Sequence, residues 1–240
     1  MSEVLYIVIP AYNEEENIEN IVNDWYPVVV QRGNSASRLV IIDDGSKDNT
    51  RAILEKCRQS RPLLEVHTKV NGGHGAAVLY GYKYALSQGA DYIFQTDSDG
   101  QTIPSEFEKF WELRDDYDLV IGHRSSREDG LARVLVTRIL RYVIRLSFKV
   151  DVVDANTPFR LMEAACLKEN IRYVPDDFNL SNVVLSVVYY KKNQRIKYLP
   201  ITFRQRQGGK NSINLRKITE IGIRAFRDFR EINKVIERLS

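Results

Sequence analysis

The stretch Tyr92–Gln101 reads YIFQTDSDGQ, a short apolar run that passes directly into a polar cluster. The apolar run is typical of a buried strand. Asp97 and Asp99 then stand one position apart, with Gln101 two positions further on, so three oxygen-bearing side chains follow one strand. Such a set suits a hard divalent cation that keeps several waters and also touches a diphosphate. A solvated turn is the alternative, because Asp, Ser and Gly are common turn residues.

The same order of apolar run and polar cluster recurs through the first 122 residues. Strands are expected at 5–10, 38–43, 63–67, 90–96 and 118–122, and helices at 14–30, 48–59, 75–88 and 104–115. This alternation is typical of βαβ units and predicts an α/β fold with a mainly parallel sheet flanked by helices. Ligands of such sheets bind beyond the carboxyl ends of the strands, where all five polar clusters are expected to converge.

The pattern changes after residue 122. We expect a basic amphipathic helix at 131–149, an extended segment at 151–162, helices at 163–170 and 179–192, a strand at 195–203 and a long helix at 213–238. Because no repeat or linker separates these segments, we predict one domain over 1–240. It consists of a first half, 1–122, a second part, 123–212, and a C-terminal helix, 213–240.

The composition is globular, with 43% hydrophobic and 28% charged residues, and the net charge is only +3. The charge is uneven, because segments 131–150 and 204–217 carry five cations each and no acid. Such basic blocks favour an anionic partner, which could be a phosphate, a membrane surface or a nucleic acid. Single-stranded nucleic acid also requires stacking aromatics. Only Tyr142, Phe148 and Phe203 are available, so a nucleic-acid-binding protein is the weaker interpretation.

Two cysteines, Cys57 and Cys166, lie in expected helices without metal-ligand spacing, which favours buried thiols in a reducing compartment. No signal peptide is expected, because the first residues lead straight into a strand without a charged region or cleavage site. No apolar run of about 18 residues is present, so no membrane-spanning helix is expected. These features predict a cytoplasmic location.

Four motifs resemble the family 2 glycosyltransferases of GT-A fold. They are VIPAYNEE at 8–15, IDDGSKD at 42–48, NGGHGAA at 71–77 and TDSDGQ at 96–101. The match holds in order and spacing over the first half of the chain. The resemblance implies an inverting transfer from a nucleotide-diphosphate sugar. It makes 1–122 the nucleotide-sugar-binding half and 123–212 the acceptor half. A nucleotidyltransferase shares this sheet topology but would have a Gly-rich, basic first loop, which 10–14 is not.

The resemblance also implies which residues bind the donor. They are Pro10, Tyr12, Glu14, Asp43, Asp44, Asn71, Gly75, Asp97 and Ser98, together with Arg206, Lys210 and Ser212, which would close over the diphosphate. Tyr12 can offer a flat face to a base, and an Asp at a strand end can accept from a base N–H or a ribose hydroxyl. For segment 43–46 the alternative is a turn, with Ser46 or Asp48 as a helix cap. For segment 71–75 the alternative to sugar-donor binding is a turn that leads from a loop into a helix.

Asp97, Asp99 and Gln101 correspond to the family's metal site, which implies a Mg²⁺ or Mn²⁺ cofactor that stabilises the leaving nucleoside diphosphate. The Asp-x-Asp-x-Gln form is similar to the dolichyl-phosphate mannose synthase branch, which implies a polyprenyl phosphate acceptor. Arg124 and Arg133 would then clamp the phosphate, as planar guanidinium groups do well. The branch has Ser and Gly where this sequence has Thr137 and Pro158.

The helix at 131–150 could lie on an anionic membrane, because it mixes arginines with many apolar residues. An ordinary core-facing helix with a solvated basic side is the alternative. The final helix could pack on the domain, form a homodimer or touch a membrane. Together these expectations describe a peripheral protein at the inner face of the membrane.

A second acceptor class is indicated by Asp176–Ser181. This segment resembles the Glu-Asp-x-Asp-Leu motif of members that glycosylate hydroxyl groups, where the second acid is the general base. Asp177 would then deprotonate a hydroxyl on a surface glycan. A phosphate is already anionic and needs no base. The alternative for the Asp176–Asp177 pair is a cap on the helix at 179–192.

Overall fold

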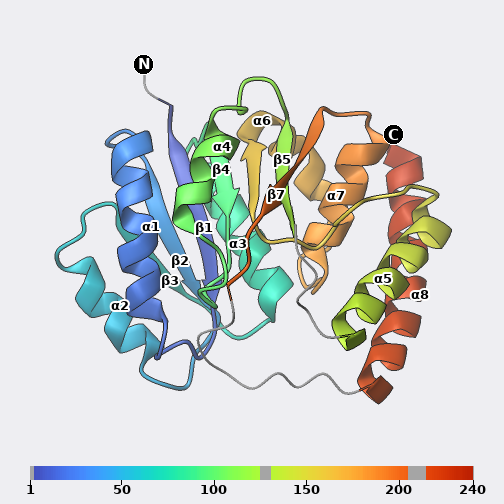
Figure 1. Ribbon diagram of the computed structural model, residues 1–240, viewed down its shortest axis with the longest axis horizontal. Helices are drawn as coiled ribbons and strands as arrows, with labels where there is room; N and C mark the ends of the chain where they lie inside the picture. The colour runs from blue at the N-terminus through green and yellow to red at the C-terminus, as the bar shows by residue number, and fades with distance from the viewer. Residues whose placement is uncertain (1–2, 125–130, 205–214, 240) are drawn as a thin grey trace.

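The computed structural model describes residues 3–124, 131–204 and 215–239 of the chain (Figure 1). For residues 124, 131–137, 215–225 and 239 the description covers the backbone alone.

One sheet runs through the described residues. Its strands are β1 (Leu5–Ala11), β2 (Arg38–Asp43), β3 (Leu64–Thr68), β4 (Tyr92–Gln95), β5 (Leu119–Arg124), β6 (Arg160–Glu163) and β7 (Ile196–Ile201), in the order β3-β2-β1-β4-β6-β5-β7. Only β6 is antiparallel to its neighbours in this sheet, so β5 and β7 point the same way as β1 to β4. The carboxyl ends of all strands except β6 therefore share one edge.

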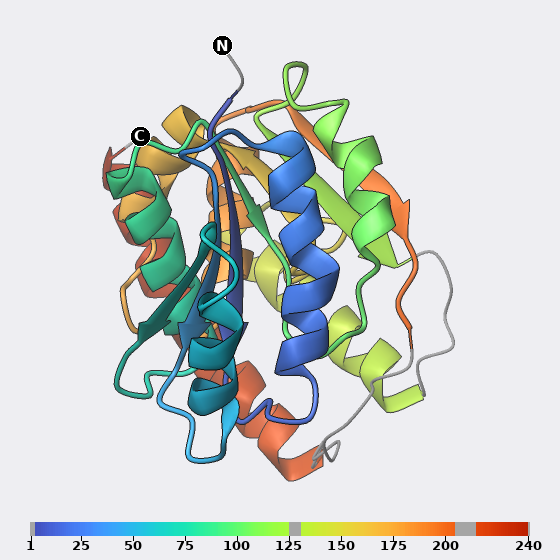
Figure 2. The ribbon, with the colours of Figure 1, turned by 90° about the vertical axis from the view of Figure 1, so that its left-hand side faces the viewer.

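Helices cover both faces of the sheet (Figure 2). They are α1 (Ile18–Arg32), α2 (Thr50–Arg58), α3 (His74–Ser87), α4 (Glu108–Trp111), α5 (Leu131–Phe148), α6 (Ala164–Asn170), α7 (Ser181–Lys191) and α8 (Leu215–Leu239), with 3₁₀ turns η1 (Pro104–Phe107) and η2 (Ile171–Tyr173). The strands divide their side chains between two cores because successive residues face opposite sides. In β1, Leu5, Ile7 and Ile9 pack with α1, α2 and α4, whereas Tyr6 and Val8 pack with α3 and α7.

The predicted α/β fold with a mainly parallel sheet and flanking helices is confirmed. The extended segment expected at 151–162 contributes the antiparallel strand β6 only from Arg160 onward. Asp48 accepts a hydrogen bond from the Thr50 N–H at 3.0 Å, but the residue that directly precedes α2 is Asn49, which forms no side-chain cap. The capping alternative for the Asp176–Asp177 pair is wrong, because α7 begins at Ser181 and Leu180 precedes it without a side-chain cap.

The long C-terminal helix packs on the rest of the molecule. In Figure 1, α8 lies beside α5 on the flank furthest from α1. Phe229, Ile232 and Ile236 of α8 are buried in the core that α3, α5 and α7 share, and the Phe229 ring lies 5.2 Å from that of Phe148. Of the three roles considered for this helix, packing on the domain is therefore the one that its described residues adopt.

Candidate functional site

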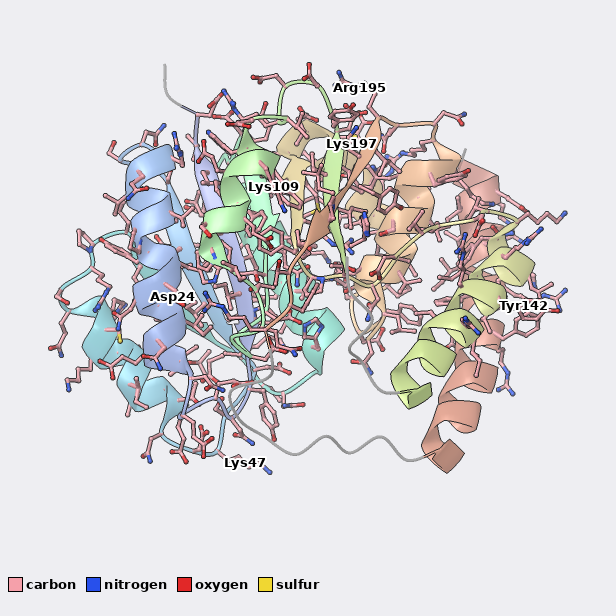
Figure 3. All side chains as sticks on the ribbon, viewed as in Figure 1. Asp24, Lys47, Lys109, Tyr142, Arg195 and Lys197 are labelled. Carbon is pink, nitrogen blue, oxygen red and sulfur yellow. The ribbon has the colours of Figure 1, made fainter. Side chains whose placement is uncertain are left out.

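The loops that follow the strands contact one another along one edge of the sheet, which we call the site edge. In Figure 3 the site edge is the lower one, where Lys47 is labelled. Arg195 lies at the opposite edge, where β7 begins. The first two loops are joined by backbone-to-side-chain hydrogen bonds, from the Asn13 N–H to Ser46 Oγ at 2.9 Å and from the Lys47 N–H to Asn13 Oδ1 at 2.8 Å. Asn13 has a φ of 54°, a left-handed conformation that asparagine tolerates better than most residues.

Asp43, at the end of β2, is 1% exposed and has one oxygen without a hydrogen bond. Its Oδ1 accepts from the Ser46 N–H at 2.9 Å, while Oδ2 is buried and meets no donor among the described residues. A buried carboxylate oxygen without a donor is costly, so this atom is suited to a ligand N–H or hydroxyl. Tyr12, at the end of the neighbouring strand, leaves 43% of its surface exposed.

Asp44, also buried, holds the third loop in place. Its Oδ1 accepts from Lys69 Nζ at 2.6 Å and from the Gly72 N–H at 3.0 Å, and its Oδ2 accepts from the Gly73 N–H at 2.8 Å. The Asn71 amide donates to the Asp44 carbonyl at 2.9 Å. Both carboxylate oxygens of Asp44 are thus used inside the protein. Direct contact of Asp44 and Asn71 with a nucleotide-sugar donor stays a prediction.

Pro10 and Glu14 have well-defined structural surroundings. Pro10 is buried in β1. The Glu14 N–H donates to Thr50 Oγ1 at 2.8 Å, its carbonyl accepts from the Ile18 N–H at the start of α1, and its Oε2 accepts from Asn17 at 3.0 Å. These contacts connect the first loop to α1 and α2. The predicted contacts of Pro10 and Glu14 with a nucleotide-sugar donor are not tested by this geometry.

Asp97 is held by two neighbours that the sequence did not single out. His74 Nε2 lies 2.9 Å from Asp97 Oδ1, and the Gln95 amide donates to the same oxygen at 3.2 Å. The negative charge of Asp97 is the main cause that raises the pKa of His74, and partial burial opposes it. His74 lies inside the NGGHGAA motif, but nothing local in that motif indicates a contact across 23 positions of the chain.

Asp99 and Gln101 shape the rest of this loop. Asp99 Oδ1 accepts from the Gln101 N–H at 3.1 Å. The Gln101 amide nitrogen donates to the Arg204 carbonyl at 3.1 Å, and the Arg204 N–H donates to the Gln101 carbonyl at 2.8 Å. Ser98 is buried between the two acids. Arg204, just after β7, is therefore joined to the predicted metal loop.

The side-chain oxygens of Asp97, Asp99 and Gln101 suit a divalent cation of the Mg²⁺ or Mn²⁺ type. Two carboxylates and an amide offer hard oxygen ligands, which such ions prefer. Within the described ranges no group of three or more His, Cys, Asp or Glu residues gathers where it could hold a metal ion.

Segment 175–180 packs against the start of α3. A Cβ atom at Gly73 would strike the Asn179 side chain, and one at Gly75 would strike the Phe178 and Asn179 carbonyl groups. Lys83 of α3 forms an ion pair with Asp176. Asp177 itself is exposed, and no hydrogen bond or ion pair joins it to another described residue. The structure thus brings Phe178 and Asn179, which follow Asp177 in the chain, against the glycine loop, a proximity that the sequence pattern did not indicate.

Replacing Gly75 with alanine is expected to lower the free energy of unfolding by about 1–3 kcal/mol, the usual cost of overpacking. The new Cβ would lie 2.6 Å from the backbone oxygen of Asn179, so segment 175–180 must move. Urea denaturation measures the change. A glycine-to-alanine change within a helix ordinarily stabilises by about 0.5–1 kcal/mol, so a more stable variant would contradict the contact.

Five predicted residues have side chains beyond the described part of the chain. The backbone of Arg124 ends β5 opposite Ile201, on the site edge, and that of Arg133 lies in the first turn of α5. Arg206, Lys210 and Ser212 fall in 205–214, outside the described residues. The roles proposed for these five remain predictions.

Arg160 is a fully buried cation that the sequence did not identify as important. Its guanidinium donates to the carbonyl groups of Ala155 at 3.1 Å, Thr157 at 2.6 Å and Asn182 at 3.2 Å. A further bond reaches Ser186 Oγ at 3.3 Å. Burial lowers the pKa of Arg160. The guanidinium thereby ties segment 155–157 to α7, next to the carboxyl end of β4.

Comparison with known proteins identifies the family. The family model described as glycosyl transferase family 2 matches residues 6–204. A UDP-N-acetylglucosamine–dolichyl-phosphate N-acetylglucosaminyltransferase of Methanococcus voltae is 27% identical over 186 residues, which cover 69% of this chain and 72% of that protein. A polyprenol monophosphomannose synthase of Mycolicibacterium smegmatis is 26% identical over 237 residues, covering 91% of this chain and 86% of that protein.

Solved structures support the same fold. The crystal structure of glucosyl-3-phosphoglycerate synthase from Mycobacterium tuberculosis with Mn²⁺, uridine diphosphate and phosphoglyceric acid superposes with a TM-score of 0.71. The two chains are 16% identical, and the match covers 96% of this chain and 78% of that one. With the family match over most of its length, this chain belongs to glycosyl transferase family 2 and is a glycosyltransferase of GT-A fold.

Proposed function

We propose that the protein is a metal-dependent, inverting glycosyltransferase that moves a sugar from a nucleotide-diphosphate sugar to a polyprenyl phosphate. The observation that carries the proposal is the meeting of Asp43, the glycine loop at 71–75 and the Asp97–Gln101 loop at one sheet edge. A nucleoside and a diphosphate need acceptors and hard cation ligands side by side, and this edge supplies both. The relatives that act on dolichyl phosphate and polyprenol supply the acceptor class.

Each loop has a task in the proposed reaction. The unpaired Oδ2 of Asp43 would accept a hydrogen bond from the base or ribose, and Tyr12 would offer its exposed ring. Asp97, Asp99 and Gln101 would hold Mg²⁺ or Mn²⁺, which when bound stabilises the charge of the leaving diphosphate. An oxygen of the acceptor phosphate, already anionic, attacks the anomeric carbon while the bond to the nucleoside diphosphate breaks. Arg124 and Arg133 would orient that phosphate.

A panel of UDP- and GDP-linked sugars tests this function. Each donor is incubated with Mn²⁺, with and without a short polyprenyl phosphate, and transfer to the lipid is measured. We expect transfer from at least one donor, only with the metal present. A donor that binds but gives no lipid product with any sugar would refute the proposed acceptor.

A hydroxyl acceptor is the second candidate, because segment 175–180 packs on the glycine loop and carries the exposed Asp177. A carboxylate beside the donor would suit the deprotonation of a glycan hydroxyl. With a lipid phosphate as acceptor, no deprotonation is required. The two candidates therefore make opposite demands on Asp177.

Paired variants at Asp177 and Arg133 distinguish these acceptors. For a lipid phosphate we expect Asp177→Asn to keep most of the activity and Arg133→Ala to lose about 10- to 100-fold, the worth of hydrogen bonds to a charged group. Initial rates at saturating donor measure both, and Asp176→Asn is the matched control. A loss of about 100-fold or more in Asp177→Asn alone, with donor hydrolysis retained, would instead favour a general base and a hydroxyl acceptor.

Contact with the membrane surface is part of the proposal, and α5 is the element that would make it. The described half of α5 turns Ile144 and Phe148 into the core, with Leu140 and Val143 packed against it. Its outer side presents Arg138, Arg141 and Arg145 with Tyr142 and Leu146, which are 63% and 53% exposed, and the exposed Lys149 directly follows the helix. Tyr142 points away from the molecule in Figure 3. No helix in the described ranges is long and apolar enough to cross a membrane.

The apolar side of α5 therefore serves the core, as in the alternative for this helix, and the proposed contact rests on its basic side. Cations near anionic lipids, with an aromatic and a leucine among them, suit a peripheral attachment. Such attachment would place the protein at the inner face of the membrane. A homodimer remains a proposal without a described interface.

A further inference from the structure

Gln95, the last residue of β4, places an amide in the middle of the core. Its neighbours along the strand are Tyr92, Ile93 and Phe94, and its own side chain is fully buried. A buried polar side chain is informative, because an unpaired amide costs free energy that an apolar residue would not. The contacts of Gln95 therefore indicate why an amide stands here.

Two buried side chains contact the oxygen of this amide, and one of them, the Tyr82 hydroxyl, also lies 3.1 Å from Asn182 Oδ1. Asn182 Nδ2 donates to Gln95 Oε1 at 2.8 Å, and the Tyr82 hydroxyl lies 2.9 Å from the same oxygen. The oxygen of the amide thus faces α3 and α7. Its nitrogen must face the other way, where it donates to Asp97 Oδ1 at 3.2 Å.

The carboxylate of Asp97 is oriented by this contact. Gln95 and His74 both meet Oδ1, from the core side and from α3 respectively. Two donors on one oxygen restrict the rotation of the carboxylate and leave Oδ2 to a further partner. That partner would be the cation in the proposed function.

The support behind Gln95 is rigid. Tyr82 and Asn182 are at most 2% exposed, and the Asn182 carbonyl accepts from the buried guanidinium of Arg160 at 3.2 Å. A continuous set of hydrogen bonds, buried up to Gln95, therefore runs from β6 through α7 to Asp97. Such a set holds its last member with little freedom to move.

We propose that Gln95 is a positioning residue for Asp97, which it orients for the divalent cation. The inference rests on the proposed function, because that function makes Asp97 a cation ligand. Partners of ligating carboxylates typically contribute about 10- to 100-fold in metal affinity or activity. Gln95 touches neither substrate nor metal and would act only through Asp97.

Direct Mn²⁺ binding is the test. Electron paramagnetic resonance of unbound Mn²⁺, in the presence of UDP or GDP, gives the Kd for the ion without any turnover. We expect Gln95→Met to raise this Kd about 10-fold or more, the typical cost of losing such a partner. Tyr82→Phe removes one hydroxyl and leaves the Asn182 bond, so it should raise the Kd less than Gln95→Met does. If Gln95→Met fails to fold, the Kd of Tyr82→Phe still tests the proposal.

Tyr189→Phe is the matched control. Tyr189 is buried on α7, and no hydrogen bond joins its hydroxyl to Gln95, Asn182 or Asp97 in the described structure. We expect its Kd to equal that of the wild type. Equal weakening by Tyr82→Phe and Tyr189→Phe would mark a general packing effect and overturn the inference.

Two further outcomes would overturn it. Folded Gln95→Met and Tyr82→Phe variants with wild-type Kd values, whatever their melting temperatures, would make Gln95 a structural residue only. A wild-type protein that takes up no Mn²⁺ with either nucleotide would remove both this inference and the metal-dependent function. The wild-type titration thus separates a failure of the function from a failure of the positioning role.

Discussion

Replacing Asp99 with asparagine is expected to slow sugar transfer about a thousandfold, because several kcal/mol of transition-state stabilisation depend on the cation it would hold. The fold should persist, since asparagine has the same shape as aspartate. In the wild type the Gln101 N–H donates to Asp99 Oδ1 at 3.1 Å, and the amide oxygen of asparagine can accept the same hydrogen bond. Only the negative charge is lost. Initial rates over a Mn²⁺ series measure the effect, and thermal unfolding checks the fold.

Asp91→Asn is the control for this change. Asp91 lies at the opposite end of the same strand, where its Oδ2 accepts from the Val4 N–H at 2.8 Å. The substitution is the same in charge and size but remote from the proposed cation. Its transfer rate should match that of the wild type. If Asp99→Asn also kept its rate within a few-fold, the loop would be a turn and not a metal site.

Replacing Arg160 with methionine is expected to lower the free energy of unfolding by about 1–3 kcal/mol, the usual cost of leaving a buried group without its partner. The Thr157 carbonyl loses both of its guanidinium bonds, whereas the Ser186 hydroxyl stays within hydrogen-bond distance of the Ala155 and Asn182 carbonyls. The carbonyls of Ala155 and Thr157 and that of Asn182 all lose their guanidinium donor. Relief from burying a cation offsets part of this cost. Urea denaturation with an unchanged m-value would measure the loss.

Arg195→Met provides the comparison. Arg195 pairs with Asp118 at 2.6 Å on the opposite edge, and its side chain is 60% exposed. Surface ion pairs of this kind contribute about 0–1 kcal/mol, so little change is expected. If Arg160→Met were as stable as the wild type, the carbonyl groups would have found other donors, and segment 155–157 would not depend on Arg160.

Residues that act through local patterns could be predicted from the sequence. The strand that ends before Asp97 and the strand that ends at Asp43 follow from short apolar runs and their polar successors, and both occur in the structure. Their convergence follows from the parallel sheet. The antiparallel direction of β6 did not follow, because four residues after an irregular segment carry no signal of direction.

Residues that act through long-range contacts could not be predicted. Gln95 reads as an ordinary end of a strand until Asn182, 87 positions away, is placed against it. Gly75 reads as a sugar-donor-binding residue at the start of a helix until the Phe178 carbonyl occupies the space of its missing side chain. Arg160 lies in the segment expected to be extended, and nothing local indicates that it is buried, because burial without a carboxylate partner is rare for arginine. Only tertiary packing distinguishes these positions.

The reversed strand β6 has a consequence for how such an enzyme can diversify. Arg160, its first residue, lies opposite Gln95 at the carboxyl end of β4, so segment 155–159 reaches the site edge before a strand instead of after one. The donor loops and this segment therefore belong to separate stretches of chain, with their own anchors. Under the proposed function, in which 123–212 is the acceptor half, exchanging 151–159 between relatives would change the acceptor and leave the register of β1, β2 and β4 undisturbed.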